Sequence, residues 1–152
     1  MEHEGMVHAL EGIRRLLRPD GSLIDIHPVL GAPLVEVHRG DGVAFAESSP
    51  SYDYEEDLRH AEAALARIVE RGMFVTDRSH EFDFLTYGSS VAELRDFMAE
   101  VGAYDGRPED DAVVAGKAEL YARVDEVMRA SGDRVEVAFH EKARMTRLTP
   151  VR

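Results

Sequence analysis

The sequence predicts an α/β fold, with helices packed on one sheet. Segments in which apolar residues recur every three or four positions alternate with segments in which apolar and polar residues alternate. These two periods are typical of amphipathic helices and half-buried strands. The chain has 152 residues, the usual size of one domain, and contains neither an internal repeat nor a low-complexity linker. We therefore expect a single domain over residues 1–152.

The first third of the chain predicts a helix, a strand and a hairpin. Helical spacing of apolar residues covers residues 6–17, and a Pro-Asp-Gly turn ends this helix. Residues 22–27 follow as a strand, which Pro28 closes because proline has no amide hydrogen for the ladder. Residues 34–37 and 43–46 flank a glycine-rich turn and predict a β-hairpin.

The remaining two thirds predict three helices and two strands. A helix is expected from about residue 53 to residue 71, because acidic residues fill its first turn and a glycine follows its end. A strand follows over residues 73–86. Ser90 and Glu93 form a capping box for the next helix, and Pro108 is expected at the first position of the last helix. Residues 134–148 alternate as a long terminal strand.

Composition narrows the functional classes. The 30 acidic residues outnumber the 18 Lys and Arg residues, giving a formal net charge of −12, which disfavours binding to the phosphate backbone of nucleic acids. The chain has no cysteine, so disulfides, thiolate catalysis and zinc–thiolate sites are excluded. It shows neither a secretory leader nor an apolar run long enough to cross a membrane. We expect a cytoplasmic protein that binds neither membrane nor nucleic acid.

Residues 10–26 carry a resemblance to a known family. They combine an amphipathic helix, a turn and an apolar strand, and the turn reads Leu17-Arg18-Pro19-Asp20-Gly21. This segment resembles the entry to the fifth strand of class I S-adenosylmethionine-dependent methyltransferases, where a helix ends in a Leu-x-Pro-Gly-Gly turn. Asp20 stands in place of the first glycine, and aspartate tolerates turn conformations. The later elements also follow the family's order, in which the last strand lies antiparallel beside the fifth.

The resemblance implies that the chain corresponds to the carboxyl-terminal half of such an enzyme. The implied fold is a partial Rossmann-like sheet of mixed strands with an inserted hairpin and about four helices. The family's cofactor site, a glycine-rich turn and an acidic residue, precedes the matched region. Gly40 and Gly42 do not replace it, because they lie in the predicted hairpin.

Two functions remain open from the sequence. The first is a truncated or split methyltransferase that is inactive alone and binds S-adenosylmethionine only if an amino-terminal half is supplied. The second is a non-catalytic binding or dimerisation module built on the same half-fold. We therefore expect no cofactor for this chain alone, and its enzymatic activity is left open.

Asp25 and His27 are the candidate substrate-binding residues. They lie two positions apart and so on one face of the predicted strand, near its carboxyl end, where ligands bind in open α/β sheets. The alternative is that both are structural polar groups. No catalytic residue is identified. The seven histidines do not show the spacing of a metal-ligand motif, so no metal site is expected.

The predicted strand over residues 23–27 also suggests a partner. In the complete family fold it lies between two strands, and this chain contains only one of them, over residues 134–148. An open edge on an apolar strand favours pairing with another chain. We expect a homodimer or association with the missing amino-terminal half, unless the hairpin at residues 34–46 covers that edge.

Overall fold

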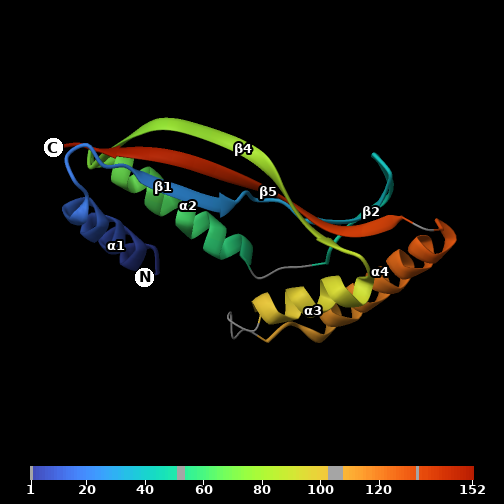
Figure 1. Cartoon of the computed structure of the whole chain (residues 1–152). Coiled ribbons are helices and arrows are strands. Elements are labelled where there is room, and N and C mark those ends of the chain that lie inside the picture. Colours follow the sequence, from blue (N-terminus) through green and yellow to red (C-terminus); the bar gives the residue numbers. More distant parts are fainter. Residues whose placement is uncertain (1, 51–53, 103–107, 133) are drawn as a thin grey trace. The chain divides into compact units, whose positions relative to one another are not determined.

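The computed structural model describes residues 2–50, 54–102, 108–132 and 134–152 (Figure 1). These residues form four helices and five strands, which confirms the predicted α/β class. None of the described helices is long and apolar enough to span a membrane. In chain order the elements are α1 (Glu2–Leu16), β1 (Leu23–Pro28), β2 (Leu34–Arg39), β3 (Gly42–Ser48), α2 (Tyr54–Glu70), β4 (Phe74–Gly88), α3 (Val91–Gly102), α4 (Asp111–Ala130) and β5 (Val135–Pro150).

The strands pair in the order β1-β5-β2-β3, and β4 also pairs with β5. The terminal strand β5 is antiparallel to β1, from Leu23 opposite Leu148 to Pro28 opposite Ala143, as the resemblance implied. It is also antiparallel to β2, which is antiparallel to β3.

The expected mixed sheet is wrong, because every pairing among the described residues is antiparallel. Contacts between β4 and β5 run in opposite directions along the two strands: Ser79 contacts Thr146, and Asp83 contacts His140. The physical reason is the place of β5. It runs opposite to β1, β2 and β4 and separates β4 from the other two, so strands that run the same way never become neighbours.

The chain divides into two compact units. Unit 1 comprises Met1–Gly31, Asp53–Phe82 and Lys142–Arg152, and unit 2 comprises Ala32–Tyr52 and Asp83–Glu141. The strands β4 and β5 contribute residues to both units.

In unit 1, α1 and α2 pack against each other and lie on one face of β1, β5 and β4 (Figure 1). On β1, alternate residues face the helices, and Leu23 packs on the core. Ile24 and Ile26 point to the opposite face, where they are 50% and 56% exposed. The buried core of unit 1 consists of Val7, Leu10, Ala64, Ile68, Phe74 and Leu148.

In unit 2, β2 and β3 form the predicted hairpin, and Gly40 occupies the left-handed region at φ 62°, which a turn between strands requires. Val35 and Val37 on β2 lie opposite Phe139 and Val137 on β5 and pack with α3 and α4. The remaining buried residues of this core are Val91, Leu94, Leu120, Tyr121, Val124 and Met128.

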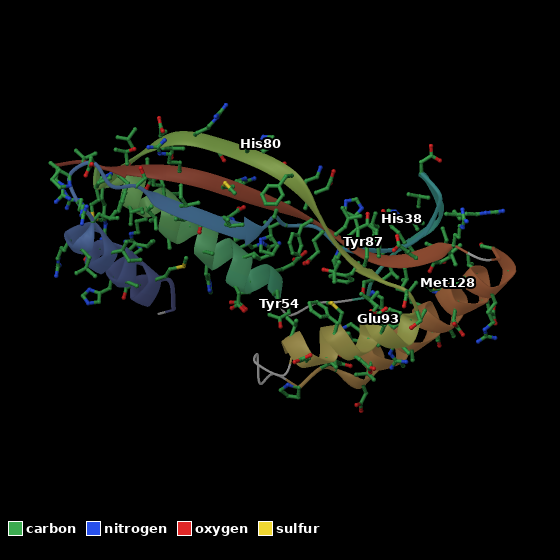
Figure 2. The ribbon with its side chains drawn as sticks, viewed as in Figure 1. His38, Tyr54, His80, Tyr87, Glu93 and Met128 are labelled. Atoms are coloured by element: carbon green, nitrogen blue, oxygen red, sulfur yellow. The ribbon has the colours of Figure 1, made fainter. Side chains whose placement is uncertain are left out.

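The helix caps in unit 2 agree in part with the sequence analysis. The Ser90 half of the capping box of α3 is confirmed, because the Glu93 amide donates to Ser90 Oγ at 3.1 Å. The Glu93 carboxylate accepts from the Ser89 amide at 2.6 Å, one residue before the expected donor. Glu93 is labelled in Figure 2. The expected place of Pro108 was wrong. Asp110 caps α4 by accepting a 2.8 Å hydrogen bond from the Ala112 amide, so the helix starts at Asp111.

Candidate functional site

The described part of unit 1 contains an open groove of about 760 Å³ between α2 and the sheet. Strand β5 contributes Arg144, Thr146 and Leu148, and β4 contributes Thr76 and Ser79. The residues of β4 from 75 to 81, which include Thr76 and Ser79, are exposed. His27 reaches it from β1, and α2 lines it with Arg59, Glu62, Ala63, Leu65, Ala66, Val69 and Glu70.

The structure brings Asp25 and His27 together, and of the two only His27 lines the groove. Both side chains face the helices, and His27 Nδ1 lies 2.5 Å from Asp25 Oδ2. The Asp25 carboxylate only accepts, so His27 Nδ1 carries the proton and donates it in this hydrogen bond. The other ring nitrogen, Nε2, is then the one left to bind a further group.

His27 Nε2 is buried and has no hydrogen-bond partner among the described residues. The His27 side chain is only 11% exposed, and the nearest carboxylate oxygen, Glu62 Oε1, is 3.7 Å from Nε2. That distance is too long for a hydrogen bond. Leaving such a buried group unpaired costs about 1–3 kcal/mol.

Glu62 connects His27 to a second pair of charges. Arg144 donates to Glu62 Oε1 at 2.9 Å and to Glu81 Oε1 at 2.8 Å. The hydrogen bond to Glu81 is the main cause that raises the pKa of Arg144, and the same bond lowers the pKa of Glu81. The oxygen that accepts from Arg144, Glu62 Oε1, is the same one that lies 3.7 Å from His27 Nε2.

The groove therefore offers an unpaired imidazole nitrogen, hydroxyl groups and an apolar wall. Ser79 and Thr146 place their hydroxyls 3.1 Å apart on its floor. Ala63, Ala66 and Leu148 supply small apolar surfaces. Among the described residues, no hydroxyl is hydrogen-bonded to His27. Nor do the described residues contain a group of three or more side chains placed to hold a metal ion.

The sequence analysis predicted the side-by-side placement of Asp25 and His27, and the structure confirms that placement. Their role in binding a substrate stays a prediction. The sequence did not indicate Glu62 or Arg144, because neither belongs to a local motif with His27. The register of β5 sets Arg144 opposite His27, and α2 places Glu62 beside both.

A second polar cluster lies in unit 2 and was also missed. Glu36 on β2 is only 5% exposed and accepts from His140 Nδ1 at 2.8 Å and from His38 Nε2 at 2.6 Å. His140 Nε2 in turn donates to Asp83 Oδ1 at 3.0 Å. Tyr87 stands edge-on to the His38 ring at 5.4 Å between centroids (Figure 2). The signal in the sequence was the alternation of β2, which places Glu36 on the face opposite Val35 and Val37.

No protein-family model matches the chain, and no curated protein or solved structure matches it significantly. The fold and the groove alone define its class: an α/β protein with an open antiparallel sheet and a groove lined by polar and apolar side chains.

Proposed function

We propose that the chain is a non-catalytic binding module whose groove in unit 1 binds a small polar molecule through His27. The observation that carries the proposal is the buried His27 Nε2, which lacks a hydrogen-bond partner among the described residues. Unpaired buried polar atoms are uncommon in folded proteins. A ligand that supplied the missing partner would recover the free energy that this atom costs in its absence.

The surroundings of His27 indicate the chemistry of the ligand. With the proton on Nδ1, the Nε2 atom accepts a hydrogen bond, so the ligand must present an O–H or N–H group. The floor hydroxyls of Ser79 and Thr146 fit further polar groups, and the alanine wall of α2 fits a small apolar part. A volume of about 760 Å³ suits a small molecule.

Binding to defined probes tests this proposal. We would follow amide and imidazole NMR signals during titration with simple sugars, N-acetyl amino acid amides and short dipeptides. The wild-type chain should show saturable shifts for at least one class, centred on His27 and α2. His27→Gln should abolish the shifts. The matched control is His80→Gln, an exposed histidine on β4 that does not line the groove (Figure 2). Equal binding by both variants, or no saturable shift with any class, would contradict the proposal.

A split methyltransferase is the second candidate. One observation favours it: β1 lies antiparallel beside the terminal strand, as the resemblance implies. The antiparallel β2 and β4 weigh against it, because nucleotide sites of the Rossmann type lie at the carboxyl ends of parallel strands. On this proposal S-adenosylmethionine would require an amino-terminal half. Calorimetry should therefore detect no binding of S-adenosylmethionine to the chain alone. A one-to-one complex at micromolar concentrations would contradict the claim that an amino-terminal half is required.

A further inference from the structure

The strand β1 is an edge strand in unit 1. Among the described residues, β5 is its only strand neighbour. Strand β2 of the hairpin pairs with β5 over residues 135–140, and no pairing of β1 with the hairpin occurs in the part of the chain that the structure describes. The Val29 amide, directly after β1, donates to the Lys142 carbonyl of β5 at 2.8 Å. Backbone groups alternate between the two edges of a strand. The N–H and C=O groups of Ile24 and Ile26 therefore point to the open edge.

The outer face of β1 carries Ile24, Ile26 and Pro28 and no charged side chain. Ile24 and Ile26 are half exposed on the outer face, and the half-exposed Met145 lies opposite Ile26. Strand β4 differs, because its exposed stretch from 75 to 81 includes several charged side chains. Charged residues on an edge strand block pairing with other chains. The apolar edge that is open to pairing in unit 1 is therefore that of β1.

We propose that β1 pairs with β1 of a second copy of this chain, antiparallel and about a two-fold axis at Ile26. An interface of this kind is self-complementary, because the same strand supplies both sides. The pairing joins the unit 1 sheet of one copy to that of the other, and Ile26 of each copy covers Ile26 of its partner. The backbone edge of β1 and Ile26 do not line the groove, and only the choice of register involves Asp25 and His27. Sedimentation of Ile26→Lys therefore tests the dimer separately from the proposed function.

The charges on β1 select this register over its neighbour. Two registers place matching faces together, one centred on Ile26 and one on Asp25, and both allow the same number of backbone hydrogen bonds. Centring on Asp25 sets two carboxylates directly opposite each other. Centring on Ile26 sets Asp25 opposite His27 of the second copy, and His27 opposite its Asp25. Like charges destabilise a cross-strand pair and complementary groups stabilise it.

Sedimentation equilibrium over a concentration series of the full chain tests the surface. The wild-type chain should form a dimer. Ile26→Lys should raise the dissociation constant of the dimer at least about tenfold, because two lysines would meet at the axis. Val75→Lys is the matched control, since Val75 is 55% exposed on β4 and lies away from the interface. The dissociation constant of its dimer should equal that of the wild-type dimer. Circular dichroism and melting temperature check that both variants fold, as expected for half-exposed positions.

A wild-type chain that stays monomeric into the millimolar range would overturn the proposal. So would a dimer that survives Ile26→Lys.

Cysteine cross-linking tests the register, since the natural chain has no cysteine. At the two-fold axis the Cα atoms of a hydrogen-bonded pair are about 5.5 Å apart, within disulfide range. Ile26→Cys should therefore cross-link under mild oxidation. Ile24→Cys should not, because its counterpart would be about 13 Å away. In addition, Asp25→Asn should weaken the dimer in the proposed register and strengthen it in the alternative one. Cross-linking through Asp25→Cys but not Ile26→Cys would overturn the register.

Discussion

Glu36 and His140 lie on neighbouring strands of unit 2, and the buried carboxylate of Glu36 accepts a 2.8 Å hydrogen bond from His140 Nδ1. Because His140 also donates from Nε2 to Asp83, both ring nitrogens carry protons when both bonds form. At pH values below its raised pKa, His140 is therefore positively charged in the folded cluster. The charged ring links β2, β5 and β4 of this unit.

This cluster predicts a pH window for stability. Hydrogen bonds to Glu36 and Asp83 raise the pKa of His140 above its ordinary 6.5. The contribution of His140 to the free energy of unfolding is thus fully present below about pH 6.5 and is lost as the pH rises through the raised pKa. Burial alone would raise the pKa of Glu36, but the bonds from His140 and His38 lower it below its ordinary 4.5. Its contribution is present above 4.5 and is lost as the pH falls through the lowered value.

We expect the cluster to stabilise unit 2 most between pH 4.5 and 6.5, the ordinary values of the two groups. Urea unfolding at a series of pH values measures this dependence. His140→Gln should cost about 1–3 kcal/mol within the window and flatten the loss at higher pH. A variant that keeps the wild-type pH profile would show that other groups cause it.

Removal of the shared carboxylate should be more damaging than removal of a surface carboxylate. Glu36→Ala removes the buried carboxylate that accepts from both His38 and His140. It should lower the free energy of unfolding by about 2–4 kcal/mol. Glu47→Ala is the control. Glu47 lies on the same hairpin as Glu36, and its ion pair with Arg123 of α4 is more exposed than the Glu36 cluster. It should cost less than about 1 kcal/mol. Chemical unfolding that ranks the two variants equally would contradict the buried role of Glu36.

The core of unit 1 predicts a clear contrast between two apolar positions. Ile68 on α2 is fully buried, and Ile68→Ala should cost about 2–5 kcal/mol because it removes buried surface and leaves a cavity. Leu16 at the end of α1 is 87% exposed, so Leu16→Ala should change the free energy of unfolding by less than about 0.5 kcal/mol. Thermal unfolding of both variants measures the difference, and similar losses would indicate that Leu16 is covered in solution.

His27 predicts a separation of binding from stability. If its buried Nε2 forms a hydrogen bond only with the ligand, His27→Gln should change the free energy of unfolding by no more than about 1 kcal/mol. Binding of the probe should be lost. Asp25→Asn should weaken binding as well, since it removes the charge that holds the ring in one tautomer. Large destabilisation by His27→Gln without any loss of binding would instead assign His27 a structural role. Denaturant unfolding and NMR titration of the same samples distinguish the two.

The sequence by itself determined the local elements. Apolar periodicity predicted the four helices, the hairpin around Gly40 and the long terminal strand, because helix and strand periods depend on residues close together in the chain. Alternation along β1 likewise placed Asp25 and His27 on one face. The resemblance identified β5 as the neighbour of β1.

Only the tertiary structure decided which distant residues meet. The position of β5 in the sheet makes the sheet antiparallel, where mixed strands were expected, and its register brings Arg144 to His27 and His140 to Glu36. Strand order and register follow from which faces of distant segments bury each other, and periodicity within one segment carries no information about that choice. For this reason Asp25 and His27 were accessible from the sequence, whereas the charges that surround them were not.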